Sequence, residues 1–165
     1  MYGITKHPLT GKYAIVMEYH PKGNLRSNFE EIGNKTWHEC VDILEIMASG
    51  LKTVHEKDIV HCDLHSGNVL YGDCPRIADF GLSKVANSSA GCMQKGSYGV
   101  IPYMAPELFR GQPHSKATDV YAFGIIMWEI SSGEPAFSDR NHSIHLISDV
   151  CNGLRLAILQ DTPGD

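Results

Sequence analysis

The stretch "IVHCDLHSGNVLYGD" at residues 59–73 places His61, Asp63 and His65 at alternate positions, with Asn68 five residues after the aspartate. If this stretch were extended, the first three side chains would point to one face, and imidazole with carboxylate is a ligand set for zinc or iron. The spacing alone is weak evidence, because a histidine that follows an apolar pair is more often a core residue than a ligand. The stretch therefore has to be judged together with the rest of the chain.

The composition favours one folded domain. The 165 residues are 42% hydrophobic and 20% charged, close to globular values, so the chain can bury a core. A formal net charge of -5 argues against a nucleic-acid partner, which would need clustered Lys and Arg. We expect no membrane span, since the apolar run "VYAFGIIMWEI" is short and contains Glu129. The cysteines are scattered without a C-x-x-C pair, which predicts neither a disulfide framework nor a zinc site and fits a reduced, cytoplasmic protein.

The first half of the chain contains a predicted strand and a long helix. "KYAIVMEY", Lys12–Tyr19, is rich in apolar and β-branched residues, which is typical of a strand. After Thr36, apolar residues recur at steps of three and four as far as His55, which predicts a largely buried helix. Thr36 and Glu39 have the spacing of a capping box, so the helix should begin directly after Thr36.

The second half alternates short strands, a polar run and helices. The apolar runs at 68–72 and 76–81 are separated by a turn and predict a small hairpin. The small, polar residues 83–99 show no period and predict a surface loop. Residues 118–132 are apolar nearly all round and precede a glycine, which predicts a core helix, and 141–153 form a weaker helix candidate.

Three short motifs, in order, point to one family. "HCDLHSGN" supplies Asp63 and Asn68, "DFG" follows at 79–81, and "APE" follows at 105–107. In this order and approximate spacing the chain resembles the protein kinase family. "VMEY" resembles the kinase hinge and "DVYAFGIIMWEI" the central helix of the large lobe, so the resemblance covers nearly the whole chain.

The resemblance implies an α+β, protein-kinase-like fold, mostly the helical large lobe with the last small-lobe strands and hinge. Residues 1–20 would be the end of the small lobe and the hinge, and 21–165 the large lobe, truncated at its C-terminal end. In addition, the family's Gly-rich loop, strand lysine and helix glutamate do not precede Met17 within this sequence. We therefore expect the 165 residues alone to have little or no kinase activity.

The implied reaction is transfer of the γ-phosphate of ATP to a hydroxyl of a protein substrate. By resemblance, Asp63 would accept the proton of the substrate hydroxyl, and Asn68 and Asp79 would bind Mg2+. Oxygen donors of this kind suit Mg2+, which prefers hard carboxylate and carbonyl ligands. His65 would lie near the transferred phosphate.

The resemblance also implies a nucleotide site. Met17 falls at the gatekeeper position, and Glu18, Tyr19 and His20 fall where backbone groups face adenine. Leu70 falls where an apolar side chain lies under the adenine ring.

Further positions match structural residues of the family. His61 and Phe80 occupy positions of the apolar spine, and Asp119 matches the aspartate at a helix start that braces the catalytic loop. Glu107, the glutamate of the "APE" motif, would lack its usual Arg partner, because the sequence stops before the helices that supply it.

One departure from the family concerns regulation. Cys62 stands where most members have an Arg before the catalytic Asp. A neutral thiol cannot pair with a phosphorylated loop residue, since the ordinary thiol pKa is about 8.5. We therefore expect activity that does not require phosphorylation of Ser88, Ser89 or Ser97.

Other departures concern rate and branch. His65 replaces the Lys that Ser/Thr kinases use near the transferred phosphate, and Val100 replaces a Thr. A neutral His supplies one donor and less charge, which predicts slower transfer. "HSGN" also differs from the Ala-Ala-Arg run of tyrosine kinases, and "KATDVYAFGIIMWEI" resembles the tyrosine-kinase-like Ser/Thr branch. A catalytically silent, kinase-like interaction module is the alternative, and a metallohydrolase built on the histidine cluster is a third.

Overall fold

The computed structural model describes residues 2–86 and 99–159. The longest helix is α2 (Trp37–Glu56), and it begins where the sequence predicts. The Thr36 hydroxyl accepts a hydrogen bond from the Glu39 backbone N–H (3.4 Å), and the Glu39 carboxylate accepts one from the Thr36 N–H (2.8 Å). The predicted capping box is therefore confirmed.

Helix α4 (Lys116–Ser132) begins two residues before the predicted start at Thr118. The cap is Ser115, whose hydroxyl accepts the Thr118 N–H, while the Thr118 hydroxyl accepts the Ser115 N–H. Thr118 is the third residue of the helix, and its hydroxyl replaces the Glu side chain that usually completes a capping box. Gly133 ends the helix in a left-handed conformation with φ of 69°, as predicted.

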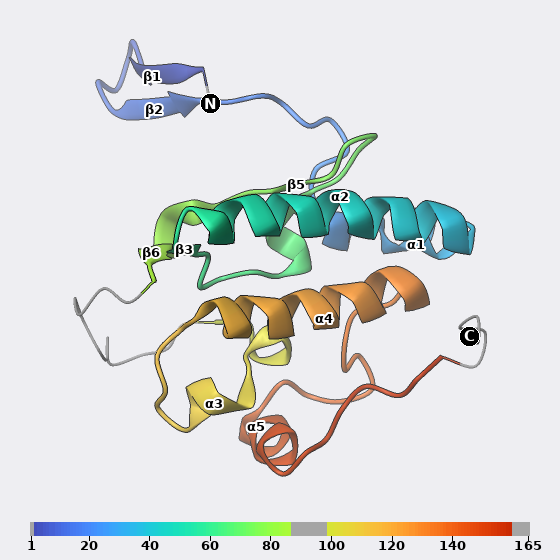
Figure 1. Cartoon of the computed structure of the whole chain (residues 1–165). Helices are drawn as coiled ribbons and strands as arrows, with labels where there is room; N and C mark the ends of the chain where they lie inside the picture. Colours follow the sequence, from blue (N-terminus) through green and yellow to red (C-terminus); the bar gives the residue numbers. More distant parts are fainter. Residues whose placement is uncertain (1, 87–98, 160–165) are drawn as a thin grey trace.

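The hydrophobic core lies around α2 and α4, which pack against each other (Figure 1). Helix α1 (Phe29–Gly33) contacts α4, and α5 (Ile144–Cys151) packs with the short helix α3 (Pro106–Phe109). The predicted weak helix within 141–153 is therefore confirmed as α5. Fully buried aliphatic side chains join these elements, among them Leu25, Ile32, Met47, Ile126, Ile130 and Leu146.

Three two-stranded antiparallel sheets occur in the described residues. Two of them are only two residues long on each side, and they lie where the loop around Asp63 enters and leaves the core. The pairs are β1 (Gly3–Lys6) with β2 (Tyr13–Val16), β3 (Ile59–Val60) with β6 (Lys84–Val85), and β4 (Val69–Leu70) with β5 (Arg76–Ile77).

The strand predictions are partly correct. The hairpin predicted at 68–72 and 76–81 is confirmed as β4 and β5. The strand predicted over 12–19 is shorter, since only 13–16 pair with a neighbour, and that neighbour, β1, was not predicted. The expected loop at 83–99 begins with strand β6, because Lys84 and Val85 pair with β3, and its residues 87–98 lie outside the described part.

The short single-turn helices were not predicted from the sequence, because three residues carry no periodic pattern. They are η1 (Leu25–Asn28), η2 (Ser66–Asn68), η3 (Phe80–Leu82) and η4 (Ile101–Tyr103). The mixture of helices and short strands confirms the predicted α+β class. None of the described helices is long and apolar enough to cross a membrane.

Candidate active site

A buried carboxylate holds the loop that carries the candidate catalytic residues. Asp119, near the start of α4, accepts hydrogen bonds from the backbone N–H groups of His61 (2.8 Å) and Cys62 (3.1 Å). The ring of His55 on α2 lies 2.9 Å from the same carboxylate. Cys62 has a positive φ of 68°, which is uncommon for a residue with a side chain, and these bonds stabilise it. The predicted bracing role of Asp119 is thus confirmed, and it fixes the backbone immediately before Asp63.

The His61 side chain joins this loop to the "DFG" segment. It is fully buried; its Nε2 lies 2.9 Å from the Ala78 carbonyl oxygen, and its Nδ1 accepts the Asp63 N–H (3.3 Å). Its ring contacts the ring of Phe80, with centroids 4.8 Å apart, as the apolar-spine positions predict. His61 therefore orients both sides of the site from within the core.

These contacts leave no support for a zinc or iron cluster at residues 61, 63 and 65. Both nitrogens of the His61 ring are already engaged, and the segment after His65 turns into η2 instead of continuing as a strand. Within residues 2–86 and 99–159, no group of three or more His, Cys, Asp or Glu residues could hold a metal ion. The alternating pattern reflects a core histidine followed by a loop that turns into η2.

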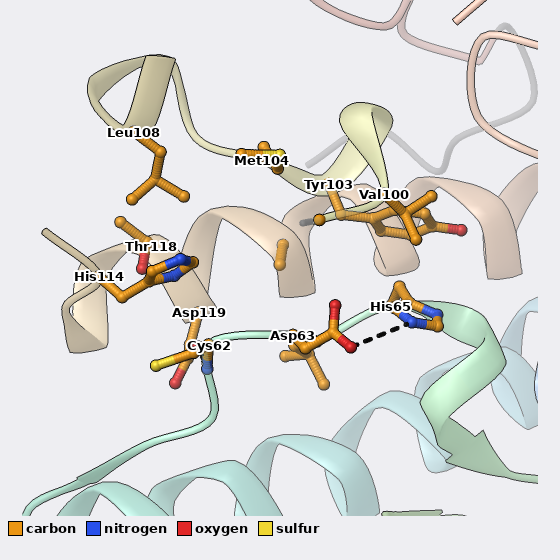
Figure 2. A pocket seen from close by; sticks show the side chains of 13 residues that line it. Cys62, Asp63, His65, Val100, Tyr103, Met104, Leu108, His114, Thr118 and Asp119 are labelled. Carbon is orange, nitrogen blue, oxygen red and sulfur yellow. Dashed lines mark hydrogen bonds and ion pairs between the residues drawn. The ribbon is translucent and has the colours of Figure 1, made fainter. Parts of the chain in front are cut away.

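Asp63, Asn68 and His65 lie together in this loop. The Asn68 amide donates from Nδ2 to the Asp63 carbonyl oxygen (2.9 Å) and to its carboxylate (3.3 Å). His65 Nε2 lies 3.8 Å from the Asp63 carboxylate, and Figure 2 shows the two side chains pointing toward each other. Because the Asn68 NH2 group is used on Asp63, its amide oxygen is the atom left for a ligand.

A backbone hydrogen bond brings Asp79 to the same place. The Ala78 N–H, one residue before it, donates to the Asn68 carbonyl oxygen (2.8 Å). Asp79 itself has a left-handed conformation with φ of 60°, and its exposed carboxylate accepts the Gly81 N–H (3.3 Å). A carboxylate and an amide oxygen, together with substrate phosphates and water, form the hard donor set that suits Mg2+.

The predicted nucleotide residues lie on a more open part of the molecule. Met17 is 52% exposed and Tyr19 84% exposed, and both follow β2 without regular structure. Glu18 approaches Arg76 of β5 (3.9 Å), which is the cross-strand partner of half-buried Leu70. The linker 17–20 therefore runs near the hairpin that carries Leu70.

A water-sized cavity of about 20 Å³ lies beside Asp63. Figure 2 shows its walls, which come from the Asp63 loop, the segment from Gly99 to Leu108, and α4. Burial lowers the pKa of His65 despite the nearby Asp63 carboxylate, and it raises the pKa of the Cys62 thiol to about 11. At neutral pH both side chains are therefore uncharged in this wall.

A buried polar network beside the site was missed in the sequence. The Tyr103 hydroxyl donates to the Glu129 carboxylate (2.7 and 2.8 Å), which leaves the Ser66 hydroxyl to donate to Tyr103 (2.7 Å). The Ala136 N–H completes it by donating to Glu129 (2.9 Å). The available signal was Glu129, the one acidic residue within the apolar run 120–130, because buried charges are seldom left without partners.

The comparison with known proteins settles the family. The model of the protein kinase domain matches residues 1–162. The chain belongs to the protein kinase family. It is 33% identical over 153 residues to mitogen-activated protein kinase kinase kinase 13 of Homo sapiens and 30% identical to mitogen-activated protein kinase kinase kinase dlk-1 of Caenorhabditis briggsae. The predicted protein kinase family is confirmed by these matches, and the similar proteins are mitogen-activated protein kinase kinase kinases.

The matched region covers 92% of this kinase chain but only 16% of the human relative and 18% of the Caenorhabditis protein. Another relative, mitogen-activated protein kinase kinase kinase 12 of Rattus norvegicus, is 32% identical over the same length. The chain thus spans about a sixth of the length of these relatives, and the match concerns the kinase domain.

Proposed function

We propose that this kinase chain takes part in transferring the γ-phosphate of ATP to a Ser or Thr hydroxyl of a protein. The observation that carries the proposal is the contact of Asn68 Nδ2 with both the backbone and the carboxylate of Asp63. It holds the Asp63 carboxylate in place and leaves the Asn68 amide oxygen for a ligand, while the Asn68 carbonyl oxygen accepts the N–H of Ala78, the residue before Asp79. A structural turn would not require this combination.

The roles follow from charge and position. Asp63 orients the substrate hydroxyl and accepts its proton. Asn68 and Asp79 would hold Mg2+, which supplies neutralisation of the phosphate charge when bound. His65 offers Nε2–H near Asp63, with less charge than a Lys would bring. Transfer should therefore be slower than in relatives with Lys.

ATP would lie between the linker and the β4–β5 hairpin. Backbone groups of Glu18, Tyr19 and His20 would face adenine, with Met17 beside it and Leu70 beneath it. The ion pair of Glu18 with Arg76, the cross-strand partner of Leu70, supports this arrangement.

The test is Asp63→Asn in the full-length protein, with transfer of labelled phosphate to a protein substrate as the readout. Loss of a group that accepts and orients a proton lowers the rate by about 100-fold or more. Asp73→Asn, at an exposed turn between β4 and β5, is the matched control and should keep the rate. An unchanged rate in Asp63→Asn would contradict the proposal.

Binding of Mg2+ and ATP separates this proposal from a silent interaction module. Calorimetry on the full-length protein should show ATP binding that strengthens with Mg2+, and Asp79→Asn should remove that strengthening. The 165 residues expressed alone should show little or no transfer. Robust transfer by the 165 residues, abolished by Asp63→Asn, would contradict this last expectation.

A further inference from the structure

Gly67, two residues after His65, lies directly beneath the imidazole ring. A Cβ atom built at Gly67 would lie 2.8 Å from both Cε1 and Nδ1 of His65, closer than real Cβ contacts. Gly67 is not among the residues with positive φ, so its backbone conformation is open to any residue. Glycine is required here for steric reasons, because any larger side chain at position 67 would collide with the His65 ring.

Gly67 and His65 also share a hydrogen bond, which determines which ring nitrogen carries the hydrogen. The Gly67 N–H donates to His65 Nδ1 (3.0 Å). A ring nitrogen that accepts a hydrogen bond carries a lone pair, so the hydrogen of the neutral ring lies on Nε2. Nε2 is the atom that faces the Asp63 carboxylate at 3.8 Å (Figure 2).

A third contact further restricts the position of the His65 ring. The His65 ring lies against the Tyr103 ring, with centroids 5.7 Å apart and planes tilted by 49°. The side chain is only 17% exposed. The ring is therefore held from below by Gly67 and on another side by Tyr103, with one donor directed toward Asp63.

We propose that Gly67 is a positioning residue for His65, and that the two residues form a matched pair: the ring needs the missing Cβ and the N–H of Gly67. A Lys at position 65 has no ring over Gly67 and no atom to accept its N–H. Gly67 would then be dispensable. The pairing deepens the proposed function and rests on it in one respect, that the donor of His65 faces a catalytic Asp63.

The test is a double-variant cycle in the 165-residue chain, using Gly67→Ala, His65→Lys and the two together. A forced contact in a packed site is destabilising, so Gly67→Ala should raise the equilibrium constant for unfolding in urea by roughly tenfold. With His65→Lys present, the same change should no longer raise it; it should lower it by about two- to fivefold, because Ala restricts the unfolded chain more than Gly does. Equal effects in both backgrounds would overturn the proposal.

Nitrogen spectra provide a second measurement that does not depend on catalysis. In the chain with 15N-labelled histidine, the ring signals of His65 are assigned by their loss in His65→Lys. They should shift in Gly67→Ala and stay in place in Gly72→Ala, whose added Cβ meets nothing within 4 Å. Unmoved His65 signals in Gly67→Ala would overturn the pairing.

Two outcomes remain decisive if a variant fails to fold. If Gly67→Ala is unfolded and the double variant is folded, the pairing is supported; if both are unfolded, it is overturned. In the full-length protein, Gly67→Ala should lower kcat more than it raises KM, and His65→Lys should restore kcat. Failure of phosphate transfer in the unmodified protein would contradict the proposed function alone, because the unfolding cycle and the spectra do not use it.

Discussion

The loop around Asp63 and the β1–β2 hairpin are held in different ways. In the loop, backbone N–H groups donate to the buried Asp119, and the buried His61 ring contacts the Ala78 carbonyl, so the loop is bonded to groups in the core. All four residues of β2 are exposed, and the hairpin depends on its own backbone bonds. Two isolated strands are marginally stable in water. The loop with the proposed catalytic residues is thus built into the core, whereas the linker proposed to face the nucleotide follows an exposed hairpin.

The largest effect should come from removing the Asp119 carboxylate, which holds the loop around Asp63. Asp119→Ala leaves two backbone N–H groups and the His55 ring without their acceptor in a buried place, which should cost about 3–5 kcal/mol of unfolding free energy. Urea denaturation of the 165-residue chain measures it. The matched control is Asp42→Ala, whose side chain is 57% exposed and which should change stability by less than about 0.5 kcal/mol. A similar small change for both would show that the loop does not depend on the core.

A smaller effect, with a defined pH dependence, should come from Glu129→Gln. Burial raises the pKa of Glu129, although the Ala136 N–H and the Tyr103 hydroxyl act in the opposite direction. A carboxyl with a raised pKa binds its proton more tightly when folded, so its contribution to stability falls as pH rises above the unfolded value of about 4.3. Gln does not titrate.

The unfolding free energy of the unmodified chain, minus that of Glu129→Gln, should therefore decrease between pH 4 and pH 7. The difference cancels the titration of all other groups, which is why the variant is needed. Glu134→Gln, at an exposed position just after α4, serves as the control. A difference that grows with pH would show that hydrogen bonding outweighs burial at Glu129.

On the hairpin, Ile15→Ala should change stability by less than about 0.5 kcal/mol, because the Ile15 side chain is 62% exposed. Thermal or urea unfolding of the 165-residue chain provides the measurement. A cost of 2 kcal/mol or more, typical of large-to-small changes in a core, would mean that the hairpin is packed and would remove the contrast with the Asp63 loop.

The smallest effect should come from replacing Ser88, Ser89 and Ser97 together by Ala. These residues lie outside the described part of the chain. Cys62 cannot pair with a phosphate, since burial raises the pKa of its thiol to about 11, and the loop is held by Asp119. Phosphate transfer by the full-length protein should change by less than about twofold. Loss of activity in the triple variant would show that a group other than Cys62 pairs with a phosphorylated serine of this segment.

Much of the framework could be predicted because it depends on neighbours in sequence. The Thr36 capping box, the helix over 141–153 and the β4–β5 hairpin all follow from residues a few positions apart. The start of α4 was predicted two residues late, because a Ser115–Thr118 pair is a weaker capping signal than one with Glu. Strand β1 was missed, because its four residues, three of them exposed, show no hydrophobic alternation.

Sequence order alone determined the family, the candidate residues Asp63, Asn68 and Asp79, and the two long helices α2 and α4, because these rest on short motifs and local periodicity. Only the tertiary structure decided that His61 belongs to the core, that Glu129 meets Tyr103, and that the residues of a possible metal cluster do not form one. The physical reason is that hydrogen bonds between distant segments depend on burial and direction, which the packing of α2 against α4 sets. The same holds for Gly67: the steric requirement for glycine at this position follows only from the His65 ring packed against it.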